Sequence, residues 1–94
     1  MNFKLKLMAF SKLKQNWDSY NADEISLNSI ITAHKILNIL SYLDTDEIHV
    51  FPMRNGGIQI DIGEFKEIEI FNNNVKEIQF DSEGNILSQK EYQI

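Results

Sequence analysis

Residues 48–62 read Ile-His-Val-Phe-Pro-Met-Arg-Asn-Gly-Gly-Ile-Gln-Ile-Asp-Ile, a pattern typical of two strands joined by a tight turn. Glycine accepts the positive φ that such a turn requires, so we place the turn at Asn55-Gly56-Gly57. The length of this loop decides the fold, because a slip of one residue turns every side chain of a strand to the opposite face.

Two loop lengths are compatible with these turn residues. A two-residue turn would place Phe51 and Met53 beside the three isoleucines of the second strand. A three-residue loop, Asn55–Gly57, places Ile48 and Val50 there instead and separates apolar from polar side chains more completely. We therefore predict the three-residue loop, with the apolar row of each strand facing the core.

The chain has 94 residues, of which 43% are hydrophobic, enough for one modest core. We therefore predict a single domain over residues 1–94. It contains no cysteine, which excludes disulfides and thiolate metal sites. No apolar run approaches the ~20 residues that span a bilayer, and the first residues lack the apolar region of a signal peptide. We expect a cytoplasmic protein with no membrane partner.

The net charge of −5 is unevenly distributed along the chain. Residues 1–16 carry four lysines and no acidic residue, whereas the remainder carries five basic and fourteen acidic residues. Nucleic-acid readers gain most of their affinity by neutralising phosphates, so an acidic body argues against this class. It favours steering of a basic protein partner.

Apolar residues recur at helical spacing in two N-terminal segments. Over residues 3–15 and just beyond, this stripe consists of Phe3, Leu7, Phe10, Leu13 and Trp17. Residues 3–7 also alternate as a half-buried strand would, but we prefer a helix. Ser26 can cap a second helix over residues 27–40, whose apolar stripe consists of Ile30, Ala33, Ile36, Leu37 and Leu40.

Alternation predicts strands over about residues 47–53, 58–62, 67–71, 75–80 and 86–92. A three-residue loop at 72–74 would bring Ile68, Ile70, Ile78 and Phe80 to one face. A five-residue loop at 81–85 would add Ile86 and Tyr92 to that face. The predicted fold is therefore α+β, with two N-terminal helices packed on one face of a four- to five-stranded antiparallel meander.

The opposite face of this sheet would be acidic, with large apolar groups among the charges. We predict that it binds the partner, through Phe51, Met53, Gln59, Asp61, Glu67, Glu69, Phe71 and Glu77. Glu69 and Glu77 would lie opposite each other, which is unfavourable unless a cation bridges them. The alternative interpretation is a solvated sheet face without a partner.

Catalytic chemistry has few candidates in this sequence. No serine lies in a nucleophile elbow, and no phosphate-binding loop or His-x-x-x-His metal spacing is present. His49 and Asp61 are expected to lie across the hairpin from each other and could act as an acid–base pair. Because no third group accompanies them, we assign no catalytic residue, no metal and no cofactor.

Residues 16–22 read Asn-Trp-Asp-Ser-Tyr-Asn-Ala and form the other unusual segment. Trp17 and Tyr20 need partners for their N–H and O–H groups if they are buried, and Asp18 can cap nearby backbone amides. Two interpretations stay open, namely a plug that closes the core and an exposed aromatic recognition loop.

These residues, together with Pro52 and the Gly56-Gly57-Ile58-Gln59-Ile60-Asp61 run, resemble small, mostly uncharacterised bacterial proteins. Their pattern is Trp-Asp-Gly-Tyr-Gly-Ala, a short helix and Pro-x-x-x-Gly-Gly-Ile-x-Leu-Glu-Trp, which corresponds to residues 16–62 here. Ser19 and Asn21 replace glycines of that pattern, and Asp61 and Ile62 replace its Glu and Trp. The resemblance implies a bacterial or phage origin and a helix-plus-sheet domain, with a place in toxin–antitoxin or phage-conflict loci.

The function predicted from the sequence is a small non-enzymatic interaction module, antitoxin-like or inhibitor-like, that binds a basic protein surface. Two rival hypotheses belong to other classes. One is a small hydrolase or nuclease-like effector that uses His49 and Asp61. The other is a structural module that self-assembles through an edge strand.

Overall fold

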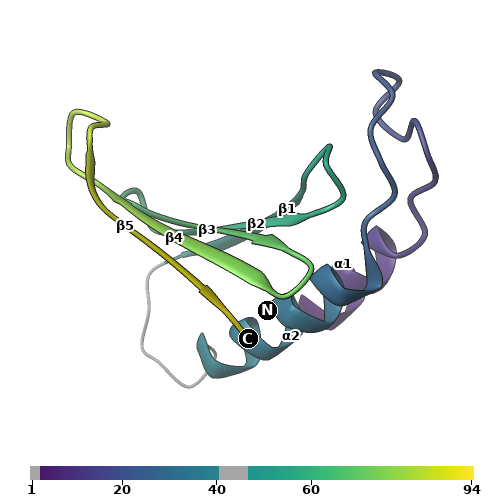
Figure 1. The fold of residues 1–94 in the computed structure, drawn as a ribbon, viewed down its shortest axis with the longest axis horizontal. Coiled ribbons are helices and arrows are strands. Elements are labelled where there is room, and N and C mark those ends of the chain that lie inside the picture. The colour runs from purple at the N-terminus through teal and green to yellow at the C-terminus, as the bar shows by residue number, and fades with distance from the viewer. Residues whose placement is uncertain (1–2, 41–46) are drawn as a thin grey trace.

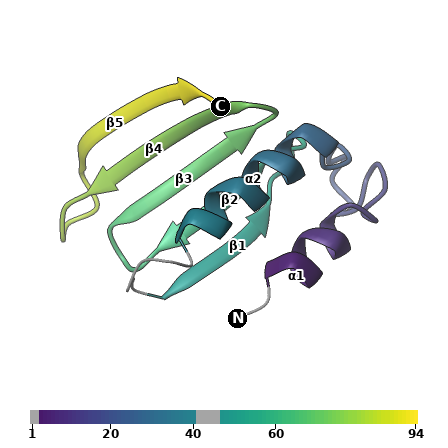
Figure 2. The same cartoon turned by 90° about the horizontal axis from the view of Figure 1, so that it is seen from below.

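The computed structural model describes residues 3–40 and 47–94. Within these ranges the chain forms α1 (Phe3–Phe10), α2 (Leu27–Leu40), β1 (Ile48–Pro52), β2 (Ile58–Ile62), β3 (Lys66–Phe71), β4 (Asn74–Phe80) and β5 (Ile86–Gln93). Each strand runs antiparallel to the next in the order β1-β2-β3-β4-β5, so the predicted α+β class and antiparallel meander are confirmed. Figure 2 shows α2 in front of the sheet near β2 and α1 beside the edge strand β1, with β4 and β5 on the far side of α2.

The second helix forms as its sequence predicts. It begins at Leu27, because the hydroxyl of Ser26 accepts a hydrogen bond of 3.0 Å from the backbone N–H of Ser29 and caps the first turn. Its predicted apolar stripe faces the core, where Ala33, Ile36 and Leu37 are buried. The apolar period and the cap therefore agree, which is why both ends of this helix match the prediction.

The first helix is shorter than predicted, since it ends at Phe10 and not near residue 15. The backbone N–H groups of Lys12 and Leu13 donate to carbonyls three residues earlier, at 3.1 Å each, so the chain tightens into turns. Leu13 and Trp17 still pack against the core beside the buried Leu7. The apolar spacing thus identified core residues correctly and overestimated the helix.

The hairpin between β1 and β2 has a three-residue loop, but the loop is Arg54-Asn55-Gly56 and not Asn55–Gly57. Met53 and Gly57 pair through a hydrogen bond of 2.9 Å, and Gly56 adopts a φ of +90°. A turn whose third residue has positive φ is common for loops of this length. The register differs from the predicted one by an even number of residues, so Ile48 and Val50 do share the buried face with the isoleucines of β2.

The predicted three-residue loop between β3 and β4 is wrong. The turn has two residues, Asn72 and Asn73, and pairs Ile70 with Val75 and Ile68 with Glu77. This exchange brings Val75 and Glu77 to the face of the core isoleucines. Ile78 and Phe80, which were predicted to lie on that face, are on the opposite one. Two-residue turns are the commonest hairpin connections.

A contact with α2 accompanies this turn. Asn72 has a φ of +56°, and its backbone N–H donates a 2.7 Å hydrogen bond to the hydroxyl of Ser29. Ser29 is fully buried and also accepts a hydrogen bond from the Ser26 hydroxyl at 2.6 Å. The turn is therefore held by the second helix, a contact that local sequence patterns do not reveal.

The last hairpin follows the prediction in part. Phe80 pairs with Ile86 as expected, but a register shift between Gln79 and Phe80 interrupts the ladder. Ile86 is 57% exposed and lies outside the core, whereas Tyr92 packs against it. The irregularity explains why the two predicted core residues of β5 have different environments.

The core joins side chains from α1, α2 and the first four strands. Figure 1 shows the helices below the sheet, and the strands curving above them. At its hairpin end, Gly57 lies so close to β3 that an added Cβ would be 2.3 Å from the carbonyl oxygen of Ile70. Such an approach is possible only for glycine, which accounts for this part of the hairpin sequence.

We expect Gly57→Ala to lower the free energy of unfolding by about 3 kcal/mol, because the backbone of β3 cannot move away without disrupting the ladder. Gly84→Ala is the matched control, since Gly84 has a φ of +86° but open space around its Cα. We expect only the backbone cost there, about 1–2 kcal/mol. Denaturant unfolding measures both, and equal losses would contradict the packing argument.

Candidate functional site

We call the side of the sheet that carries the core isoleucines the core face, and the opposite side the outer face. Cross-strand register places the following side chains on the outer face: Phe51, Gln59, Asp61, Glu67, Glu69, Phe71, Lys76, Ile78 and Glu91. All of the predicted partner-binding residues within the strands are therefore on this face, except Glu77. Met53 directly follows β1 and pairs with Gly57 at the base of the first hairpin loop.

An amide lies between two carboxylates in the middle of the outer face. The Nε2 of Gln59 donates to Asp61 Oδ1 at 2.9 Å and to Glu67 Oε1 at 3.0 Å. Burial raises the pKa of Glu67, and the charges of Glu69 and Asp61 raise it further, against a smaller opposing effect of Lys76. A nearby cation would therefore reduce the repulsion among these carboxylates.

The patch does not have the composition of a metal site. Among the residues that the structure describes, no group of three or more His, Cys, Asp or Glu side chains is arranged to hold a metal ion. Gln59, which lies between the two carboxylates, is a neutral amide, and its N–H groups already donate hydrogen bonds to them.

Lys76 lies between two acidic residues on the outer face, with Glu69 opposite it on β3 and Glu91 opposite it on β5. The sequence prediction missed Lys76 and Glu91 because it assigned the wrong loop length between β3 and β4. The sequence would have placed both residues on the outer face if the alternation of β4 and β5 had been read with a two-residue turn.

The assignment of Glu77 to the partner-binding face is wrong. Glu77 lies on the core face, where its carboxylate forms a 3.1 Å ion pair with Lys66 and a hydrogen bond with the hydroxyl of Tyr92. Burial disfavours its charged form, but the Tyr92 and Lys66 contacts outweigh burial and lower the pKa of Glu77. Burial and the Glu77 contact raise the pKa of Tyr92 to about 12.

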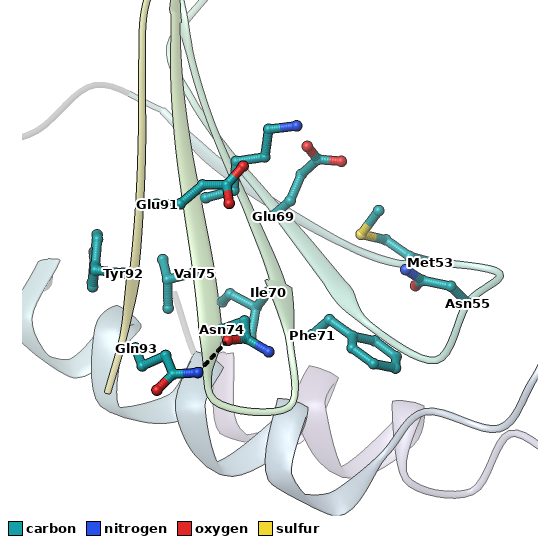
Figure 3. Close-up of a pocket in the computed structure, with 11 residues that line it drawn as sticks. Met53, Asn55, Glu69, Ile70, Phe71, Asn74, Val75, Glu91, Tyr92 and Gln93 are labelled. Atoms are coloured by element: carbon teal, nitrogen blue, oxygen red, sulfur yellow. Dashed lines mark hydrogen bonds between the residues drawn. The ribbon is translucent and has the colours of Figure 1, made fainter.

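A groove of about 460 Å³ crosses the end of the outer face. Figure 3 shows the carboxylates of Glu69 and Glu91 projecting into the same space, with Met53 and Phe71 toward the β1–β2 hairpin. The remaining lining residues are Asn55, Asn74, Lys76 and Gln93, together with three residues of the core face, Ile70, Val75 and Tyr92. We call this the outer-face groove. It combines an apolar end with a charged end, as many peptide-binding surfaces do.

Two of the predicted residues belong to a different part of the outer face. The ring of Phe51 stacks on His49 with centroids 6.3 Å apart, and Lys6 Nζ lies 5.8 Å from the Phe51 centroid. His49 Nε2 pairs with Glu47 Oε1 at 3.2 Å, although Asp61 is its cross-strand neighbour. The imidazole is thus engaged with Glu47, and the geometry gives no support to a His49–Asp61 acid–base pair.

The loop at residues 16–22 is fastened to the first hairpin by Asp18 and Arg54. Asp18 Oδ1 accepts hydrogen bonds from the backbone of Tyr20 at 2.8 Å and Ala22 at 3.1 Å, and its Oδ2 pairs with Arg54 Nε at 2.7 Å. Arg54 also donates to the carbonyl of Tyr20. Burial opposes ionisation of Asp18, but these hydrogen bonds and the guanidinium leave its pKa lowered.

The two aromatic residues of this loop have different environments. Trp17 packs against the core, and its indole N–H donates a 2.7 Å hydrogen bond to the carbonyl of Asp23. Tyr20 is 76% exposed. The loop therefore acts as a plug at Trp17 and presents an aromatic side chain to solvent at Tyr20. The packing of Trp17 agrees with the plug interpretation, and a recognition role for the exposed Tyr20 stays a prediction.

Comparison of the chain with protein-family models, with curated proteins and with solved structures finds no match. In the part of the chain that the structure describes, no helix is long and apolar enough to cross a membrane.

We expect Glu77→Gln to bring the pKa of Tyr92 from about 12 back toward the ordinary tyrosine value of about 10. The raised pKa means that this contact stabilises the fold fully below about pH 10 and that the stabilisation is lost as the pH rises toward 12. Absorbance titration of tyrosinate, with Tyr92→Phe to identify the residue, measures the shift. Glu83→Gln, in an exposed turn, is the control, and an identical Tyr92 titration in both glutamine variants would contradict the assignment.

We expect Trp17→Ala to destabilise the protein by about 3 kcal/mol, because it removes an aromatic group packed against the core. Trp17→Phe keeps most of this packing, loses the hydrogen bond to Asp23 and should cost about 1 kcal/mol. Tyr20→Ala, at an exposed position of the same loop, should change stability by less than about 0.5 kcal/mol. Thermal unfolding compares the three, and a Tyr20→Ala loss as large as that of Trp17→Ala would overturn the division of the loop.

Proposed function

We propose that this protein is a small non-enzymatic interaction module, antitoxin-like or inhibitor-like, whose outer face binds a basic segment of a partner protein. The observation that carries the proposal is the outer-face groove, in which Met53 and Phe71 lie beside the carboxylates of Glu69 and Glu91. Apolar anchors beside like charges are what a short cationic, apolar segment would complement.

Electrostatics favours a basic partner at this face. Asp61, Glu67, Glu69 and Glu91 carry negative charge there, and Lys76 offsets one of them. Such a field accelerates the encounter with a cationic surface, and salt weakens the effect. A lysine or arginine near Glu67 would also relieve the repulsion that raises its pKa.

The proposal includes the packing of both helices on the core face, which leaves the outer face free for a partner. Burial of the apolar stripes of α1 and α2 in one cluster with the core isoleucines supports it. The two rival functions have less support. His49 is engaged with Glu47, and β5, although an edge strand, carries Lys90 and a register irregularity, which oppose pairing between edges.

The bacterial or phage-conflict setting, like the cytoplasmic location, belongs to the proposal and rests on the resemblance described above. One structural observation agrees with that resemblance. Ser19 and Asn21, which stand where the similar pattern has glycine, have φ angles of +65° and +64°. Glycine adopts such angles without strain, so the glycine pattern and this backbone are compatible.

A synthetic peptide of alternating lysine and leucine tests the outer face. Glu69→Lys/Glu91→Lys should slow its association at least tenfold at low salt, because the attractive field is reversed. Glu64→Lys/Glu83→Lys changes the net charge equally at exposed turns and should alter the rate by less than about twofold. Stopped-flow kinetics measures both rates, with circular dichroism as the check on folding.

Phe71→Ala supplies the second arm of this experiment. Phe71 is 43% exposed and lines the groove, so the variant should fold normally and speed dissociation about tenfold. Equal effects of the two double variants would show that net charge alone acts. An unchanged dissociation rate for Phe71→Ala would remove the groove from the interface, and either result would reject the proposal.

A further inference from the structure

A second groove, of about 390 Å³, lies between α1 and α2 and takes no part in the proposed function. The two helices lie side by side in Figures 1 and 2. We call it the helix groove and define it by its lining: Lys4, Leu7, Met8, Ser11, Leu27, Ile30, Ile31, His34 and Lys35. Leu7 is buried and connects its base to the core.

Large apolar side chains along this groove are open to solvent. Leu27 is 68% exposed, Met8 48% and Ile31 44%. Single exposed apolar residues are normal on protein surfaces, but several around one groove mark an interaction site. The core does not require them, because the buried stripe of α2 is formed by other residues of the same helix.

The charge around the helix groove is opposite to that of the outer face. Lys4, Lys35 and His34 line it, and none of its described lining residues is acidic. Two further lysines, at positions 12 and 14, follow α1, whereas Lys6 lies over the Phe51 ring of the outer face. On a chain with a net charge of −5, this is a locally basic surface around an apolar strip, and an acidic, apolar partner complements it.

The shape of the groove favours a helix as its occupant. Leu27, Ile31 and Lys35 recur every four residues along α2, and Lys4 and Met8 do so along α1, so two parallel ridges border the groove. From Leu27 to Lys35 the ridge extends about 12 Å, or two helical turns. A small anionic amphiphile would stay largely in water there, whereas typical ligand sites enclose 70–90% of their ligand's surface.

We propose that the helix groove binds an acidic amphipathic helix of a partner protein. Leucine or phenylalanine side chains at positions i, i+3, i+4 and i+7 of that helix would contact Met8, Leu27 and Ile31. Its glutamates or aspartates would pair with Lys35 at the rim of the groove. This surface is separate from the outer face, so the two proposals succeed or fail independently.

Two synthetic helical peptides with the same leucine stripe test the proposal. One carries glutamates beside the stripe and the other lysines. In nuclear magnetic resonance titrations of the full chain, the glutamate peptide should shift the amide signals of Met8, Leu27 and Ile31, and the lysine peptide should leave them in place. Ile31→Asp should weaken the binding of the glutamate peptide at least tenfold. Lys35→Glu should weaken it and strengthen binding of the lysine peptide.

Ile39→Asp is the matched control, because Ile39 is 64% exposed on the same helix and does not line the groove. It should leave the affinity for the glutamate peptide unchanged. Three results would overturn the proposal. They are equal binding of both peptides, no binding of the glutamate peptide, and an equal loss of affinity for it in the two aspartate variants. Self-association that Ile31→Asp abolishes, measured by light scattering without peptide, would also overturn it, since a second copy would then cover the groove.

Discussion

The buried hydroxyl of Ser29 is the constraint on which the arrangement of charges depends. It accepts the backbone N–H of Asn72 at 2.7 Å, which holds the β3–β4 turn at two residues with Asn72 at positive φ. Because side chains alternate along a strand, that turn decides the face of every residue in β4 and, through pairing, in β5. A hydrogen bond to a fully buried acceptor is costly to break, so the choice of turn is strongly coupled to the position of α2.

The consequence of this register is a division of acidic residues between two environments. On the core face, Glu77 is neutralised by Lys66 and hydrogen-bonded to Tyr92, so it contributes to structure. On the outer face, Glu67 remains near other carboxylates and its pKa is raised. Like charges close together are unfavourable for folding, and their presence on an open face is compatible with the proposed role in binding.

Two surfaces of opposite charge follow from the same fold. The outer-face groove is acidic with Met53 and Phe71 at one end, and the helix groove is apolar with Lys35 at its rim. The loop at residues 16–22 lines neither groove. The ion pair between Asp18 and Arg54 connects it to the hairpin that supplies Met53. The proposed basic segment and the proposed acidic helix would therefore occupy separate surfaces.

The sequence by itself determined the fold class, the second helix with its cap at Ser26, and the buried row of the first hairpin. These features depend on local periodicity. The predicted hairpin loop lies one residue too late, which shifts the cross-strand pairing by two residues and leaves the faces unchanged because the strand period is two. The sequence also identified most of the acidic outer face, from Phe51 to Phe71. Local patterns were sufficient wherever neighbours along the chain supply the interaction.

Only the tertiary structure decided the end of α1, the faces of β4 and the partners of His49 and Glu77. Each depends on a group distant in the sequence or on competing local choices of similar energy. Ser29 is 43 residues from Asn72, and this contact favours the two-residue turn over the three-residue loop that grouping the apolar residues indicated. Lys76 and Glu91 lie on the outer face and Glu77 on the core face. The reason is the β3–β4 turn, which is held by a buried hydroxyl of α2 and determines the face of each residue.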